Sequence, residues 1–214
     1  MKFSAAASVG LGLAGVATAA PLTTRDTKSA ADIILEIAPT SGTCASTATE
    51  CRTNVQIAPF MVKAAARYGL DSAAPIAAVL ALTAFESVGY EFSTNQQQTA
   101  GQGTSNMQMY TYNLLYAQSI PALKDKLAAL GTPDALKDTQ DAGLKNKVRD
   151  LVRADEYNFG SGPWFLSTQC KSDVIETLKQ NPDDGFTAYM GCVGTSMTDE
   201  RQAYWTRAKK AFGL

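Results

Sequence analysis

Glu86 is the residue whose type and position most clearly suggest chemistry. It ends the apolar run Ala81-Leu82-Thr83-Ala84-Phe85, which is typical of the last turns of a buried helix. Burial disfavours the charged form of a carboxyl group, and the negative end of a helix dipole does the same. Both effects would raise the pKa of Glu86 and let it act as a general acid near neutral pH. A surface glutamate at a frayed helix end fits the same position, so position alone leaves both interpretations open.

The segment that follows, from Phe92 to Leu123, contains no Asp, Glu, Lys or Arg. Amide side chains donate and accept hydrogen bonds and aromatic rings offer flat faces, so this composition suits a neutral sugar. Gly101 and Gly103 allow a tight turn or a close approach to a ligand. A polar loop followed by an ordinary helix is the alternative. The amides are Asn95, Gln96, Gln97, Gln98, Gln102, Asn106, Gln108, Asn113 and Gln118, and the aromatics are Phe92, Tyr110, Tyr112 and Tyr116.

Histidine is absent from the sequence. Its absence excludes Ser-His-Asp and Cys-His nucleophile relays and histidine metal ligands. Acid–base chemistry must then use carboxylates, Lys, Tyr or Cys. The chain has 19 Lys and Arg against 20 Asp and Glu, and this near-neutral balance argues against nucleic acid as a partner. The four cysteines lack the paired C-x2-C spacing of a zinc site, and Asp183-Asp184-Gly185 is interpreted as a turn with too few oxygen ligands for calcium. We expect no metal and no cofactor.

The amino terminus resembles a secretory signal. Met1-Lys2 is followed by an apolar run over residues 3–20 that contains the small-residue pattern Ala17-Thr18-Ala19. A membrane anchor is the alternative, but a run this rich in Ala and Gly is weakly hydrophobic. We therefore expect a signal peptide over 1–19, a leader and first short helix over 20–40, and a single helical domain over 41–214 in a secreted protein with no membrane association after cleavage.

Cysteine usage agrees with secretion. An even number of cysteines in an oxidising compartment suggests two disulfides, and four cysteines allow three pairings. We favour the two pairs that close the shorter loops. These are Cys44 with Cys51 and Cys170 with Cys192.

Hydrophobic periodicity predicts an almost wholly helical chain, with no convincing alternating strand and at most a small β-hairpin between Tyr90 and Gly103. The run at 73–85 is apolar on all sides, which is typical of a buried central helix. Trp164 is assigned to the core, with a sugar platform as the alternative, and Trp205 is expected to pack the last helix onto the body. The predicted helices are 29–37, 56–68, 73–85, 120–130, 142–153, 162–170, 172–180 and 198–212.

Several short motifs, taken in their order along the chain, resemble those of the soluble lytic transglycosylases and goose-type lysozymes. Glu86-Ser87 is similar to the Glu-Ser of that family, and the run from Gly101 to Gln108 is similar to its glycine-bearing loop and Gly-Leu-Met-Gln step. Here Ser105-Asn106 stands where Gly-Leu is expected. The family's Tyr-Asn-Ala-Gly is resembled by Tyr157-Asn158-Phe159-Gly160, and a rival match is Tyr189-Met190-Gly191 after Ala188. The leader and the cysteine layout also resemble small secreted fungal proteins of this type.

The resemblance implies a mainly α, lysozyme-like fold and cleavage of a β-1,4 N-acetylhexosamine polymer such as peptidoglycan. Glu86 would protonate the glycosidic oxygen and then act as base, while a substrate hydroxyl closes an anhydro ring. A hydrolase that inverts would need a second carboxylate to activate water. Its candidates are Glu91, Asp155 and Glu156. The substrate-binding residues carried over from the family are Ser87, Gln102, Gln108, Tyr157 and Asn158.

The altered Gly-Leu step also fits a second class of function, a catalytically inactive secreted protein that binds glycan on the same scaffold. A structural or storage domain without a ligand is a third possibility. For the first two classes the partner is a polysaccharide, and we expect the protein to be a monomer.

Overall fold

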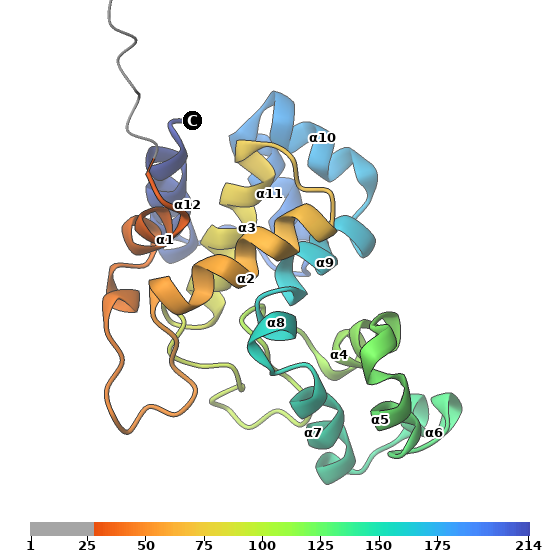
Figure 1. Ribbon diagram of the computed structural model, residues 1–214. Helices are drawn as coiled ribbons and strands as arrows, with labels where there is room; N and C mark the ends of the chain where they lie inside the picture. Colours follow the sequence, from red (N-terminus) through yellow and green to blue (C-terminus); the bar gives the residue numbers. More distant parts are fainter. Residues whose placement is uncertain (1–27) are drawn as a thin grey trace, which may run out of the picture.

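The computed structural model describes residues 28–214, and over this range the fold is mainly α (Figure 1). The predicted signal peptide and most of the leader lie outside the described residues. The helices are α1 (Ala30–Ile37), α2 (Asn54–Arg67), α3 (Ala73–Glu86), α4 (Tyr110–Ser119), α5 (Lys124–Ala128), α6 (Pro133–Asp138), α7 (Ala142–Leu151), α8 (Asp155–Asn158), α9 (Ser161–Thr168), α10 (Ser172–Gln180), α11 (Pro182–Cys192) and α12 (Asp199–Phe212), with short 3-10 turns at Pro39–Gly42 and Pro121–Leu123.

Local sequence signals explain where the long helices begin. The hydroxyl of Thr53 accepts from the backbone N–H of Gln56, and the Gln56 side chain accepts from the N–H of Thr53, which forms a capping box at the start of α2. At the start of α12 the hydroxyl of Thr198 accepts from the backbone N–H of Arg201, and the helix has Asp199 and Glu200 in its first turn and lysines in its last. Such caps satisfy backbone N–H groups that have no partner within a helix.

Helix α3 is the centre of the molecule, as its uniform hydrophobicity predicted. Of the ten residues from Ala74 to Thr83, nine are buried and Ile76 is the exception. Ala84 is buried as well. Helix α12 packs along α3, and α1, α9, α10 and α11 also contact it. Trp205 of α12 is 1% exposed and stacks on Phe186 of α11 with ring centroids 4.5 Å apart, which confirms that it packs the last helix onto the body.

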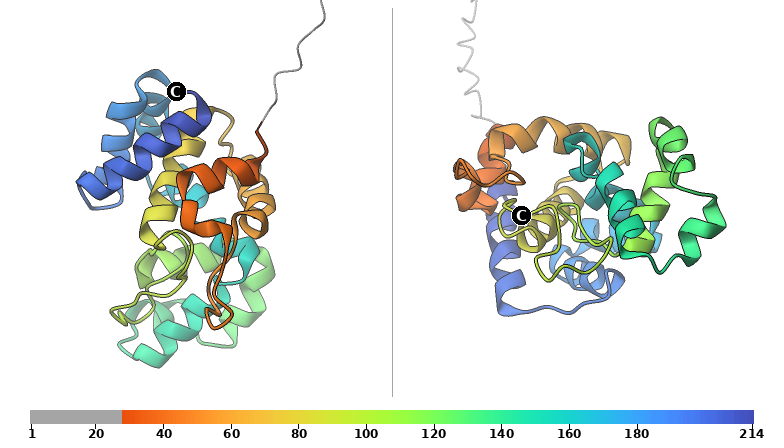
Figure 2. Two further views of the ribbon diagram at one scale, coloured as in Figure 1. Left: turned by 90° about the vertical axis from the view of Figure 1, so that its left-hand side faces the viewer. Right: turned by 90° about the horizontal axis from the view of Figure 1, so that it is seen from below.

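The buried side chains form two hydrophobic clusters, which we call the large lobe and the small lobe. The large lobe holds α1, α2, α3, α10, α11 and α12, and the small lobe holds α4, α5, α6 and α7. Figures 1 and 2 show them as separate ends of the molecule, with α9 between them. Helix α9 belongs to both, because Leu166 lies in the large-lobe cluster while Trp164 and Phe165 lie in that of the small lobe.

The two predicted disulfides are confirmed. Cys44 joins Cys51 in the loop before α2, and Cys170 joins Cys192, which ties the end of α9 to the end of α11. Glu50, inside the first loop, accepts hydrogen bonds from the backbone N–H groups of Ser93 and Thr94 at 2.9 and 3.0 Å. These bonds and Arg153 lower the pKa of Glu50 although its partial burial acts in the opposite direction. The loop is thereby fastened to the segment after α3.

Several predicted elements differ from the structure. The helix predicted over 120–130 is divided into a 3-10 turn and α5, and Pro121 stands at the first position of that turn. Asp183-Asp184-Gly185 is the first turn of α11, capped by the side chain of Asn181, and not a turn between elements. The hairpin expected between Tyr90 and Gly103 is reduced to isolated bridges, Thr94 with Gly103 and Gly103 with Gln108, among the residues described.

Candidate functional site

A pocket of about 320 Å³ lies where the two lobes meet. Its walls come from the end of α3, the loop before α4, the starts of α4 and α12, the middle of α9 and the segment after α11. Sites at the junction of two packed units are a common location for ligands. The lining residues are Leu82, Glu86, Gln102, Asn106, Met107, Gln108, Met109, Tyr112, Phe165, Val193, Gly194, Thr195 and Arg201.

Glu86 is the acidic residue of this lining. Its side chain is 25% exposed, and its Oε1 accepts a hydrogen bond from Nη2 of Arg201 at 3.2 Å. Burial raises the pKa of Glu86, and the hydrogen bond and positive charge of Arg201 oppose that rise without cancelling it. The carboxyl group therefore keeps its proton to a higher pH than a solvated glutamate does, and it lines the pocket; a general acid needs both properties.

Arg201 was not identified from the sequence, although it lies in the first turn of the well-predicted α12. Its side chain is 15% exposed. The guanidinium lies over the ring of Phe85 at 4.5 Å from the centroid, and Nη1 donates to the carbonyl oxygen of Ser196 at 3.3 Å. Its Nε is buried without a hydrogen-bond partner. Arg201 is thus fixed in place beside Glu86 with one donor unused.

The loop between Gly103 and Gln108 forms a strained wall of the pocket. Thr104 and Met107 have φ angles of 67° and 43° in the left-handed region, which is unusual for residues with side chains. A Cβ at Gly103 would lie 2.6 Å from the carbonyl oxygen of Ser93, so only glycine permits this close approach. Strained backbone of this kind persists where the surrounding structure over-determines it, and it is concentrated at functional sites.

Three amides of the charge-free segment, those of Gln102, Gln108 and Asn113, hold this wall together. Nε2 of Gln108 donates to Oδ1 of Asn113 at 2.9 Å, and Nδ2 of Asn113 donates to the carbonyl oxygen of Gly101 at 2.8 Å. Gln102 lines the pocket and donates to the carbonyl oxygen of Met107 at 2.9 Å. Asn106 keeps a buried Oδ1 with no partner. Gln102, Asn106 and Gln108 therefore all reach the pocket, but their amides are largely engaged within the protein.

Two aromatic side chains complete the pocket. Tyr112 of α4 and Phe165 of α9 line it, and their ring centroids are 4.7 Å apart in an edge-on arrangement. Trp164 is 3% exposed and packs on Tyr116 in the small lobe. The core assignment of Trp164 is confirmed, and the alternative of a sugar platform is wrong.

Three of the predicted substrate-binding residues do not line the pocket. Ser87 is fully buried, and its hydroxyl donates to the carbonyl oxygen of Thr83 and accepts from the N–H of Tyr90, so its role is to close the end of α3. Tyr157 and Asn158 lie on α8. Asn158 supports the pocket indirectly, because its Oδ1 accepts from the N–H of Ser105 at 2.7 Å. The predictions that Ser87, Tyr157 and Asn158 contact the ligand in this pocket are thus not supported by their positions.

Tyr189, from the rival match, lies near enough to Glu86 to interact with its charge. It is fully buried on α11, and its hydroxyl has no hydrogen-bond partner. Burial raises the pKa of Tyr189, and the negative charge of Glu86 raises it further. The sequence signal for this residue was the Ala188-Tyr189 pair before Gly191, which the substitution of Met190 for asparagine made less visible.

The three candidates for a second carboxylate lie elsewhere. Asp155 accepts from Nε of Arg52 at 3.0 Å, and Glu156 raises the pKa of the neighbouring Tyr157 through a hydrogen bond. Glu91 lines a small hollow beside the Cys44–Cys51 loop. None of them joins Glu86 in the lining of the pocket.

Within residues 28–214, no group of three or more His, Cys, Asp or Glu side chains has the arrangement of a metal site. Over the same range, no helix has both the length and the apolar character that crossing a membrane requires.

Comparison with known proteins gives one partial relationship. No family model matches the chain, and no solved structure matches it. A bifunctional dioxygenase–epoxy alcohol synthase of Fusarium oxysporum (strain Fo5176) is 48% identical over 161 residues, which make up 74% of this chain. The match covers 12% of that protein. The chain is therefore similar to a small part of a much longer fungal protein.

Proposed function

We propose that this chain is a secreted glycan-cleaving enzyme with a lysozyme-like fold, and that it acts on β-1,4 N-acetylhexosamine polymers such as peptidoglycan. The observation that carries the proposal is Glu86, a pocket-lining carboxyl group with a raised pKa, set opposite the amide-bearing loop before α4. We do not assign the relative's dioxygenase and epoxy alcohol synthase activities to this chain, because the match covers only 12% of the relative's length. The two disulfides agree with an oxidising, extracellular compartment.

In this mechanism the protonated carboxyl group of Glu86 donates its proton to the glycosidic oxygen as the bond to the anomeric carbon breaks. The oxocarbenium-like centre that forms is positive, and the glutamate left behind is negative and stabilises it. Arg201 then keeps the new carboxylate oriented, because its Nη2 lies 3.2 Å from Oε1. The side-chain oxygen of Gln102, whose Nε2 is the atom bonded to Met107, would accept from a sugar hydroxyl, and the ring of Tyr112 would contact a pyranose face.

The second half of the reaction favours attack by a hydroxyl group of the substrate. Among the described residues that line the pocket, Glu86 is the sole acid, so a second carboxylate is not at hand to activate water as in inverting hydrolysis. Glu86 instead takes the proton of the sugar's own hydroxyl while that oxygen bonds to the anomeric carbon. The product would be an anhydro sugar, with no net uptake of water.

The test is digestion of purified peptidoglycan and chitin oligomers by the disulfide-bonded protein, with products identified by mass spectrometry. An anhydro end group is 18 mass units, about one water, lighter than the hydrolytic product, so one spectrum distinguishes the two routes. Glu86→Gln is expected to lower the rate by a factor of about 100 or more, because it removes the only acid at the reacting bond. Glu91→Gln is the matched control, since Glu91 lies outside this pocket. Equal activity of the two variants would contradict the proposal.

A catalytically inactive glycan-binding protein is the second candidate, and the Arg201–Glu86 ion pair favours it. A carboxylate held by arginine is less ready to donate a proton, and Ser105-Asn106 replaces the Gly-Leu of the family. This candidate predicts that the wild-type protein binds glycan oligomers without turnover and that Glu86→Gln binds them equally well. Turnover by the wild type that is lost in Glu86→Gln supports the enzyme.

A further inference from the structure

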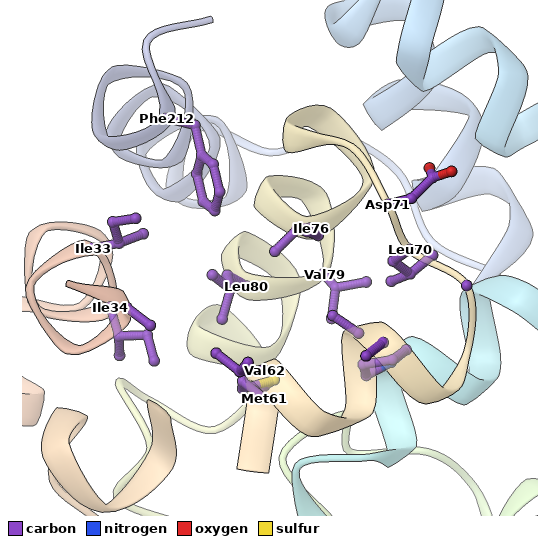
Figure 3. A pocket seen from close by; sticks show the side chains of 15 residues that line it. Ile33, Ile34, Met61, Val62, Leu70, Asp71, Ile76, Val79, Leu80 and Phe212 are labelled. Carbon is purple, nitrogen blue, oxygen red and sulfur yellow. The ribbon is translucent and has the colours of Figure 1, made fainter. Parts of the chain in front are cut away.

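A second pocket, of about 490 Å³, lies beside the first half of α3, at Ile76, Val79 and Leu80 (Figure 3). It is bounded by α1, α2, α3 and the end of α12. Val79 and Leu80 of α3 line it, whereas Leu82 and Glu86 of the same helix line the Glu86 pocket, and the two linings share no residue. We call it the apolar groove.

The lining of the apolar groove is almost entirely hydrocarbon. Side chains such as Ile34, Met61, Leu80 and Phe212 surround it, and the only oxygen atoms drawn in Figure 3 are those of Asp71 at the rim. A sugar or a peptide would lose its hydrogen bonds to water here without replacement, which is unfavourable by several kcal/mol. A saturated hydrocarbon chain loses nothing of this kind and gains from burial, at about 0.8 kcal/mol for each methylene group.

The volume fits a long chain. An engineered cavity of about 150 Å³ lined by similar side chains binds benzene, which has six carbon atoms. At the same density, a groove of about 490 Å³ accommodates roughly 20 carbon atoms. The groove is open to solvent at Val62, which is 56% exposed, so one end of the ligand can remain in water.

Charges at the rim select the head group. Asp71 forms an ion pair with Lys179 at 3.6 Å, and Lys179 also contacts Glu176 at 3.3 Å. Within this cluster of three described side chains, two carboxylates share one ammonium group, so an anionic head group beside Asp71 would meet net negative charge. An uncharged head group avoids that repulsion.

We propose that the apolar groove is a binding site for the hydrocarbon chain of an uncharged amphiphile, such as a long-chain alcohol. The site is independent of the proposed glycan chemistry, because it shares no residue with the Glu86 pocket. Binding is expected to strengthen with chain length until the groove is full.

The experiment is isothermal titration calorimetry of the disulfide-bonded protein with 1-hexanol, 1-octanol and 1-decanol. Each added methylene should tighten binding about fourfold, which is the fold-change equivalent to 0.8 kcal/mol. Octanoate should bind more weakly than 1-octanol. Glu86→Gln should bind the alcohols as the wild type does, so that the glycan proposal and the alcohol-binding proposal are tested separately.

Val62→Asp is the decisive variant, because it places a carboxylate at the rim on a side chain that is already exposed. It should weaken 1-decanol binding by about tenfold or more. Val55→Asp is the matched control. Val55 lies on the same helix and is 67% exposed, but it does not line the groove. Thermal melts of both variants verify that they fold.

Four results would overturn the proposal. They are an absence of saturable binding, an affinity that does not depend on chain length, equal effects of the Val62 and Val55 variants, and tighter binding of octanoate than of 1-octanol. Sedimentation tests the other occupant, a second copy of the chain: a dimer that Val62→Asp dissociates would assign the groove to self-association instead.

Discussion

Replacing Arg201 with glutamine isolates the interaction that controls the proposed catalytic acid. At an Nη2–Oε1 distance of 3.2 Å and an effective dielectric constant of about 20, the Coulomb attraction is about 5 kcal/mol. Removing two largely buried ions from water offsets much of this attraction, and a hydrogen bond between charged groups contributes about 1.5–3 kcal/mol net. We therefore expect a coupling free energy of about 2 kcal/mol between Arg201 and ionised Glu86.

The pH dependence fixes the sign of the effect. Burial raises the pKa of Glu86 in the folded state, so its contribution to stability is complete below the unfolded-state pKa and is lost as pH rises through the folded-state pKa. Arg201 opposes that loss. Arg201→Gln should therefore destabilise the protein little at about pH 4 and progressively more toward about pH 8, and it should move the pKa of Glu86 further upward.

The assay is urea unfolding of the wild type, Arg201→Gln, Glu86→Gln and the double variant at several pH values. In the Glu86→Gln background, the Arg201 substitution should have the same effect at every pH, because no carboxylate remains to titrate. Arg201→Lys, which keeps the charge and loses the planar stack on Phe85, should retain most of the pH dependence. A coupling free energy near zero across the whole range, or one that does not change with pH, would refute this account of the site.

Three further outcomes follow from the fold. Replacing Cys170 and Cys192 with serine opens a loop with a sequence separation of 22, and the unfolding free energy should fall by about 3 kcal/mol in denaturant titrations. Gly103→Ala places a methyl carbon 2.6 Å from a backbone carbonyl oxygen, so it should lower stability by about 1–3 kcal/mol and weaken glycan binding in the same calorimeter. Asn158→Ala removes the acceptor for the backbone N–H of Ser105 in the pocket wall. The unfolding free energy should fall by about 1–3 kcal/mol, and KM for the glycan should rise; an unchanged KM would contradict its supporting role.

Local patterns were sufficient for much of the fold. Helices α3, α10 and α12 were predicted within one or two residues, because hydrophobic periodicity, caps and helix-dipole charges are all encoded in contiguous sequence. The disulfide pairs followed from loop length. Helix α11 was missed although Asn181 and Pro182 are a cap and first-turn signal, because the acidic pair and the glycine after them suggested a turn.

The site itself was only partly predictable. Glu86, Gln102 and Gln108 were identified from residue type and motif order, and all three reach the pocket. Arg201, the partner of Glu86, was not identified, because it is 115 positions away in sequence and only tertiary packing brings the two residues together. Ser87 shows the reverse case: it is adjacent to Glu86 in sequence, but the end of α3 turns its hydroxyl inward to the backbone.

The position of α9 also limits how this molecule can move. Its side chains are anchored in both hydrophobic clusters, and the disulfide at its end fixes it to α11. Any hinge opening between the lobes would have to pull apart packed aromatic rings or twist a covalent link. Entry of the proposed polymer would therefore depend on motion of the 88–108 segment, which has left-handed backbone at Val88, Tyr90 and Thr104. If the chain turns over a polymer as proposed, a loop of some twenty residues would then limit product release, and the lobes would not.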